Sequence, residues 1–310
     1  MNKNAKILIV GDKILPGKGL IAFLQKQGLT NVFSETNTGL DLLSQKSVTA
    51  FFLKEQPEYV FLGYIKAGGI AANMKYPADF IYENLEAQNN IIRAAFKNKV
   101  KKLLFYGSSC AYPKKCPQPI REEYLLEGAL EKTSQPYAIS KIAGIEMCRS
   151  FRQQYGTDFF SLIPATIYGP GDDFNLENGH VISSLIKRFH EAKIEKKKEI
   201  EVWGSGKPRR EFIYIDDLCR ASVFLMNNDF NINLINVGFG NDISIKKLAY
   251  LVKKIVGFKG KIIFNTSKPD GVLRKILDSS KINDIGWKPE FDLERGLKLT
   301  YEWYQKENNI

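Results

Sequence analysis

Short apolar runs alternate with helical patterns through the first 170 residues of this 310-residue chain, and no other feature restricts the fold as strongly. The runs with the length of buried strands are Lys6–Val10, Asn31–Ser34, Tyr59–Leu62, Val100–Tyr106 and Phe159–Ile163. The helical patterns between them are Gly17–Gln27, Gln45–Lys54, Pro77–Lys99 and a stretch that begins at Pro136. Because strands that alternate with helices pair in parallel, we predict an α/β fold with a doubly wound, Rossmann-type parallel sheet.

After about residue 171 the pattern changes, because loops lengthen and strands shorten. Helices are predicted at Val181–Ala192, Asp216–Met226, Ile245–Val256 and Leu293–Gln305, with short strands at Ile200–Trp203, Phe212–Ile215, Ile235–Val237 and Lys261–Phe264. We therefore expect a dinucleotide-binding domain that carries the catalytic residues at 1–170, and a smaller C-terminal α/β domain at 171–310, with an interleaved boundary. A cleft between two such domains is a common place for a small ligand.

Composition excludes several classes of protein. The four cysteines show no metal-ligand spacing and no dense disulfide pattern, so we expect a reducing, cytoplasmic location and no metal. No apolar run approaches the length that spans a membrane, and the first run is too short for a signal peptide. The net charge of +11 suits an anionic small substrate, while the absence of an Arg-rich arm or an aromatic-interleaved basic stripe argues against nucleic acid.

The first strand leads into a glycine-containing turn of the kind that holds a dinucleotide. Gly11 and Gly17 occupy the outer positions of a Gly-x-x-Gly-x-x-Gly spacing, but Ile14 stands where the middle glycine lets the backbone approach a pyrophosphate. Gly17 begins a helix whose first N–H groups can bind phosphate. Glu35 follows the second strand, where an acidic residue accepts hydrogen bonds from an adenosine ribose. An acidic surface turn is the alternative for Glu35.

Tyr137 and Lys141 lie four residues apart at the start of a predicted helix, so their side chains share one face. An ammonium near a phenol favours the phenolate, so we expect the pKa of Tyr137 to fall towards neutrality. Such a tyrosine can give a proton to a carbonyl oxygen as a hydride reaches the carbon. A serine directly after the strand that ends at Tyr106 can bond the same oxygen. Chance occurrence of the Tyr–Lys spacing in a Lys-rich chain is the alternative.

Several short motifs, in order along the whole chain, point to one family. They are Lys66–Ile70, Tyr76–Tyr82, Gly107–Cys110, Pro136–Gly144, Val202–Gly206, Arg210–Phe212 and Ser267–Gly271. With these motifs the chain resembles the extended short-chain dehydrogenase/reductases, in the branch that epimerises and reduces GDP-linked 4-keto-6-deoxy sugars. This resemblance implies an NAD(P)-dependent oxidoreductase with epimerase activity.

The resemblance also implies roles for individual residues. Reduction would depend on Ser109, Tyr137 and Lys141, and epimerisation at C3 and C5 on an acid/base pair formed by Cys110 and His180. A thiol and an imidazole titrate near neutral pH, which suits proton exchange. The residues implied to contact the GDP-sugar are Arg188, Trp203, Arg210 and Asp270. Alternatives remain open: His180 as a helix cap, Cys110 as a small buried hydrophobe, and Trp203 as a core residue.

The cofactor residues implied by the resemblance include several departures from the family pattern. They are Gly11, Gly17, Glu35, Tyr64, Ser108, Tyr137, Lys141, Pro164, Thr166, Ile167 and His180. The family binds the 2′-phosphate of NADP through an arginine at the position where this chain has Glu35. Because Glu35 replaces that arginine, we expect NAD as the cofactor. Tyr64 replaces a small residue and Thr166 replaces an asparagine, and with Ile14 all of these departures surround the dinucleotide.

Three hypotheses follow. The first is conversion of a GDP-4-keto-6-deoxyhexose by C3/C5 epimerisation and NAD(P)H-dependent C4 reduction. The second is an epimerase whose reduction is weakened or lost, and the third is a non-catalytic nucleotide-sugar-binding subunit. A GDP-4-keto dideoxyhexose or deoxyheptose is an alternative substrate. The family commonly pairs through the helix with the Tyr–Lys motif, so we expect a homodimer that uses Ile142, Ile145 and Met147.

Overall fold

The computed structural model describes residues 1–68, 70–175, 180–268 and 270–308; Gly69 and Pro269, which belong to two of the motifs, lie outside these ranges. Its centre is a six-stranded sheet in the order β2-β1-β3-β4-β5-β9, with every neighbouring pair parallel. The strands are β1 (Ile7–Val10), β2 (Val32–Phe33), β3 (Tyr59–Leu62), β4 (Lys102–Tyr106), β5 (Phe159–Pro164) and β9 (Leu234–Val237). The predicted doubly wound parallel sheet is confirmed.

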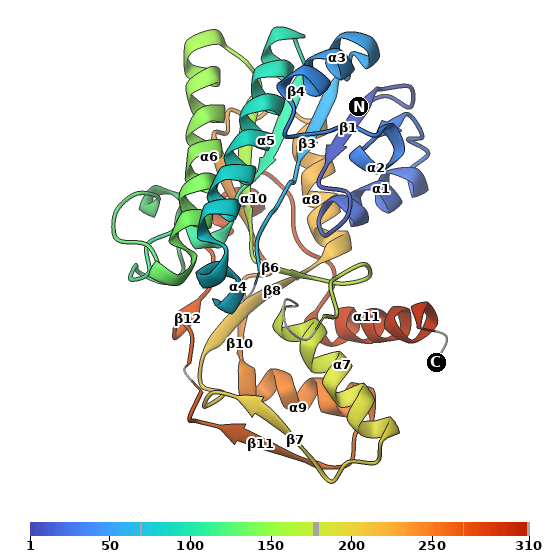
Figure 1. Cartoon of the computed structure of the whole chain (residues 1–310), viewed down its shortest axis with the longest axis vertical. Coiled ribbons are helices and arrows are strands. Elements are labelled where there is room, and N and C mark those ends of the chain that lie inside the picture. Colours follow the sequence, from blue (N-terminus) through green and yellow to red (C-terminus); the bar gives the residue numbers. More distant parts are fainter. Residues whose placement is uncertain (69, 176–179, 269, 309–310) are drawn as a thin grey trace.

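Helices cover both faces of this sheet (Figure 1). On one side α1 (Gly17–Lys26) packs against α8 (Ile215–Asn227). On the other side α6 (Gln135–Tyr155) packs against α5 (Pro77–Lys97), which also contacts α3 (Gln45–Glu55). Burial of apolar side chains between helices and sheet forms one continuous core. The predicted helices are present, and their ends lie within three residues of the predicted ends.

Helix α6 approaches the sheet closely because Gly144 faces Phe105. A Cβ atom at Gly144 would lie 2.3 Å from the Phe105 ring, and Phe105 is itself only 1% exposed. The missing side chain lets the helix backbone settle on β4, which brings the first turns of α6 over the end of that strand. Ile145 is buried, with its side chain close to Gly107, so the prediction that Ile145 serves a dimer interface is wrong.

The second half of the chain forms a smaller unit beside the sheet's carboxyl edge (Figure 1). Here β8 (Arg209–Tyr214) pairs with β6 (Thr166–Tyr168), β10 (Asp242–Ser244) and β12 (Arg274–Lys275), while β7 (Glu199–Trp203) pairs with β11 (Lys261–Asn265). The accompanying helices are α7 (Val181–Ile194), α9 (Ile245–Val256), α10 (Ser280–Asp284) and α11 (Leu293–Glu307). The two halves exchange strands, because β9 completes the large sheet and β6 joins the small one.

Several short elements carry too weak a pattern to be predicted. They are α2 (Glu35–Thr38), α4 (Ile70–Lys75), β6, β10, β12 and α10. Among the described helices, none is both long and apolar enough to cross a membrane. Within the same residues there is no cluster of His, Cys, Asp or Glu suited to a metal ion. All four cysteines are free.

Candidate active site

Lys141 is a buried lysine at the carboxyl edge of the large sheet. It lies in α6 with 1% of its surface exposed, and its Nζ donates hydrogen bonds to the carbonyls of Tyr64 (2.8 Å) and Tyr106 (3.3 Å). Tyr64 lies two residues beyond the end of β3 and Tyr106 is the last residue of β4, and these two strands are neighbours in the sheet. Tyr137, one turn earlier and 7% exposed, has its ring centroid 6.0 Å from the lysine Nζ. The predicted Tyr–Lys pair therefore lies at the sheet edge where ligands bind in such folds.

Burial determines the pKa of both residues. It lowers the pKa of Lys141 to about 7. It also raises the pKa of Tyr137, with the charge of Cys110 as a further raising cause and a hydrogen bond with Ser108 acting in the opposite direction. The prediction that Lys141 lowers the pKa of Tyr137 is therefore wrong in this structure. The reason is desolvation, which disfavours the charged form of each group.

Of the two serines after β4, Ser108 is the one whose hydroxyl meets Tyr137. The Ser108 hydroxyl also accepts a hydrogen bond from the Cys110 amide (3.2 Å), which starts a short 3₁₀ turn over Ser109–Ala111. Ser109, assigned to reduction from the sequence, contacts the second unit through its carbonyl, which accepts from Lys275 Nζ (3.3 Å). The geometry thus favours Ser108 over Ser109 as the serine that bonds a substrate oxygen together with Tyr137.

Cys110 shares its surroundings with Tyr137 and with a cation from the second unit. It is half-buried and interacts electrostatically with both the Tyr137 phenol and the Arg210 guanidinium. Arg210 lies in β8, and its Nη1 donates to the carbonyls of Arg209 (2.8 Å) and Val272 (2.6 Å). The Cys110 thiol therefore lies within electrostatic range of a phenol from α6 and of a guanidinium from β8.

His180 occupies the N-cap position of α7 but makes no side-chain capping hydrogen bond. Its side chain is 63% exposed, and its Nδ1 lies 3.4 Å from the Oδ1 atom of Asp172. This contact with Asp172 is the main cause that raises the pKa of His180. His180 therefore occupies the capping position of α7, but its side chain does not cap the helix.

The turn after β1 keeps the close packing that a dinucleotide site requires. Gly11 has a φ of +93°, and a Cβ atom there would lie 2.5 Å from the Gly63 carbonyl oxygen. Glu35 accepts hydrogen bonds from the Gly11 amide at 2.8 and 3.0 Å, and burial raises its pKa. The Glu35 carboxylate is thus held at the end of β2 beside the turn, where an adenosine ribose would bind, and is not a free surface group.

The middle of the same turn differs from a standard pyrophosphate cradle. The Ile14 carbonyl accepts from the Lys18 amide (3.0 Å), and Pro16, at the N-cap of α1, has no N–H to offer. The Tyr64 hydroxyl donates to Glu83 (3.3 Å), and burial raises the pKa of Tyr64 to about 12. The residues present fit the adenosine and the nicotinamide ends of a dinucleotide. This turn offers the diphosphate fewer backbone N–H donors than a standard glycine-rich turn does. Pro16 was missed from the sequence, although a proline at a phosphate-binding helix start is itself a signal.

The remaining cofactor residues implied from the sequence lie at the join between the two sheets. Pro164 ends β5, and Thr166 and Ile167 lie in β6 opposite Phe212 and Ile213 of β8. Both β6 residues are half-buried. The cofactor-binding roles of Pro164, Thr166 and Ile167 stay predictions.

The four predicted substrate contacts form two groups. Trp203 is 59% exposed, so the core alternative is wrong, and the Arg188 guanidinium lies 5.6 Å from its ring centroid. Asp270 accepts from the amide (2.9 Å) and hydroxyl (2.6 Å) of Ser205, two residues beyond Trp203. Arg210 belongs to the other group and interacts electrostatically with Cys110. An exposed indole with a guanidinium near its ring suits a purine base, and a guanidinium suits a diphosphate.

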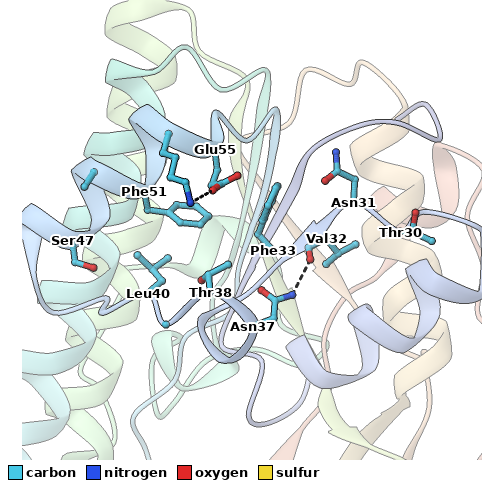
Figure 2. A pocket seen from close by; sticks show the side chains of 13 residues that line it. Thr30, Asn31, Val32, Phe33, Asn37, Thr38, Leu40, Ser47, Phe51 and Glu55 are labelled. Atoms are coloured by element: carbon cyan, nitrogen blue, oxygen red, sulfur yellow. Dashed lines mark hydrogen bonds and ion pairs between the residues drawn. The ribbon is translucent and has the colours of Figure 1, made fainter.

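A separate hollow of about 710 Å³ lies beside the edge strand β2. Figure 2 shows Phe33 and Phe51 on its walls, together with the hydrogen bond from Asn37 to the Val32 carbonyl (3.0 Å). None of the predicted site residues lines this hollow. It is distinct from the cluster around Tyr137.

The chain has near full-length similarity to known proteins. A family model described as "NAD dependent epimerase/dehydratase family" matches residues 7–238. A putative GDP-L-fucose synthase 2 of Arabidopsis thaliana is 51% identical over 304 residues, covering 98% of this chain and 93% of the relative. The GDP-L-fucose synthase of Escherichia coli strain K12 is 44% identical, covering 96% of each chain. A GDP-mannoheptose C4 reductase from Campylobacter jejuni, solved with NADP bound, is 43% identical with a TM-score of 0.90, covering 98% of this chain and 99% of that one.

We predict that Lys141→Met changes how stability depends on pH. Below pH 7 Lys141 is protonated in both the folded and the unfolded chain. Above pH 7 the folded chain releases this proton, while the unfolded chain keeps its proton to about pH 10. The unfolded state then binds more protons, so wild-type stability rises with pH, by at most about 1.4 kcal/mol per pH unit. Urea unfolding between pH 7 and 9.5 measures this rise, which the variant lacks. Lys54→Met, at a side chain that is 82% exposed, is the control; an equal effect of both substitutions would contradict the prediction.

Proposed function

Since this chain belongs to the NAD dependent epimerase/dehydratase family, we propose that it converts a GDP-linked 4-keto-6-deoxyhexose into a GDP-L-fucose-like product. The reaction combines epimerisation at C3 and C5 with NAD(P)H-dependent reduction at C4. The observation that carries the proposal is the hydrogen bond between Tyr137 and Ser108 at the carboxyl edge of the sheet, with Cys110 within electrostatic range of both Tyr137 and Arg210. The GDP-L-fucose synthases among the relatives support this choice of substrate class.

In the reduction, Tyr137 gives its proton to the C4 oxygen, and the Ser108 hydroxyl donates a second hydrogen bond to that oxygen. The nicotinamide cofactor, when bound, supplies the hydride to C4. Lys141 and the Gly11–Gly17 turn would hold the cofactor, with Glu35 at its adenosine ribose. Burial around Tyr137 excludes water, so each of these hydrogen bonds acts in a medium of low dielectric constant.

In the epimerisation, the C4 carbonyl makes the hydrogens on C3 and C5 acidic. One member of the Cys110–His180 pair removes a proton from carbon, and the electron pair moves onto the C4 oxygen as an enolate. The other member returns a proton to the opposite face of the same carbon, which inverts the centre.

The proposed cofactor is NAD(P)H with a preference for NADH. Glu35 supports this preference, because its carboxylate is fixed beside the first turn and would repel a 2′-phosphate. The related heptose reductase was solved with NADP, so the acidic residue is the feature that would distinguish this chain. Ile14, Pro16 and Tyr64 favour a second candidate function, an epimerase with weakened reduction.

The substrate sugar also has an alternative. A relative named as a GDP-mannoheptose C4 reductase matches nearly the whole chain, which supports a GDP-linked deoxyheptose as the second choice. Arg188, Trp203, Arg210 and Asp270 would bind the GDP part, which both substrates share. The homodimer, the cytoplasmic location and the division at residue 170 stay predictions.

The function is tested with purified protein, GDP-4-keto-6-deoxymannose and NADH or NADPH in deuterium oxide. We expect deuterium at C3 and C5, oxidation of the dinucleotide and a GDP-L-fucose product.

For Tyr137→Phe we expect reduction to fall by about 10² or more with deuterium incorporation retained, because only reduction needs the phenolic proton. Ser109→Ala should leave reduction far less affected than Ser108→Ala. Equal loss of exchange and reduction in Tyr137→Phe would contradict this division of roles.

The cofactor preference is tested by Glu35→Arg. Replacing a carboxylate that faces the ribose with a guanidinium should move the ratio of kcat/KM for NADPH over NADH upward by about tenfold or more. Thr36→Arg, at the next position of α2, is the matched control for added positive charge. A wild-type preference for NADPH, or an unchanged ratio in Glu35→Arg, would show that Glu35 does not select the cofactor.

A further inference from the structure

Asp172 is a buried carboxylate that the reduction and epimerisation steps above do not use. Its side chain is 5% exposed, whereas the side chain of His180 is 63% exposed. Its Oδ1 atom accepts from the Asp173 amide (2.9 Å) and lies 3.4 Å from Nδ1 of His180. The other oxygen, Oδ2, is buried and has no hydrogen-bond partner in the part of the chain that the structure describes. A buried anionic oxygen without a donor is costly, so a cationic neighbour stabilises it.

The turn after β6 holds Asp172 in this position. Gly171 has a φ of +87°, and the Asp172 amide donates to the Gly169 carbonyl (3.3 Å). The aliphatic part of Lys18, from α1, lies against Gly171, where a Cβ atom would be 3.1 Å from the lysine Cδ. On the other side, α7 begins directly after His180, whose carbonyl accepts from the Ser184 amide (2.9 Å). Backbone hydrogen bonds therefore hold both residues in place, Asp172 in the turn and His180 at the helix start.

Building on the function proposed above, we infer that Asp172 is a positioning residue for His180 in the epimerisation. The carboxylate bonds Nδ1, so Nε2 is the nitrogen left to exchange a proton with the sugar. The same carboxylate favours the imidazolium, which gives His180 the role of proton donor and leaves proton removal to Cys110. The signal in the sequence is an aspartate eight residues before the histidine, directly after a Gly-Pro-Gly turn.

The charges around the imidazole agree with this role. The contact with Asp172 is the largest cause that raises the pKa of His180, with Asp173 as a smaller contribution of the same sign. Lys18 is the cation from α1 that comes close to this loop, and its Nζ lies 5.9 Å from the centroid of the Trp303 ring. Two carboxylates thus face His180, and protonation of the imidazole balances part of their charge.

The test is Asp172→Asn, which keeps the shape of the side chain and removes its charge. The chain has only two histidines, so a protein labelled at histidine gives two titrations by NMR, with His180→Asn for assignment. The second histidine, His190, is buried against Tyr301 and has its pKa lowered, which separates the two signals. In Asp172→Asn we expect the pKa of His180 to fall towards its ordinary value and that of His190 to stay unchanged. Asp173→Asn is the matched control and should shift His180 less.

The same variants are assayed for solvent deuterium at C3 and C5. We expect Asp172→Asn to lower the exchange rate by about tenfold or more near neutral pH and to move the pH profile to lower pH, with the affinity for GDP unchanged. Asp172→Glu should restore part of the rate. An unchanged His180 titration, or equal losses in Asp172→Asn and Asp173→Asn, would overturn the inference. Absence of exchange in the wild type would instead refute the proposed function and leave the titration result standing.

Discussion

The desolvation of one ammonium group organises this site. Lys141 lies between the ends of β3 and β4 with its Nζ on two backbone carbonyls, and burial brings its pKa to about 7. Parallel strand order places those carbonyls side by side, and Gly144 lets α6 come close enough for the lysine to reach them. A charge held there is sensitive to whatever binds nearby, because little water remains to screen it. Tyr137 lies in the same dry surroundings, which raise the pKa of its phenol.

Charged side chains lie near the two residues proposed for the epimerisation. Cys110 is within electrostatic range of Arg210 from the second unit, and His180 contacts Asp172 in the turn after β6. Cys110 and Arg210 come from different units, which are joined through the hydrogen-bonded strands β6 and β9, whereas Asp172 and His180 both belong to the second unit. The residues proposed for reduction thus lie mainly at the edge of the large sheet, while Cys110 and His180, proposed for epimerisation, come from different units.

The sequence predicted the large sheet and its helices well, because buried parallel strands and amphipathic helices leave strong periodic patterns. It could not locate β12 or α2, which are too short for a pattern and exist through pairing or capping. It brought Tyr137 and Lys141 together correctly but erred on the pKa of Tyr137, because spacing does not report burial. It assigned the reducing role to Ser109, whereas Ser108 faces the phenol, because adjacent residues in a turn point in different directions.

The most direct test of this account is the proton balance when a dinucleotide binds. Calorimetry of NADH and NADPH binding at pH 8, in two buffers with different ionisation enthalpies, reports protons taken up from solvent. An anionic ligand near Lys141 should raise its pKa, so we expect uptake of roughly half a proton or more per dinucleotide by the wild type and little by Lys141→Met. Equal heats in the two buffers for the wild type, or the same uptake in the variant, would show that Lys141 is not the charge on which the site depends.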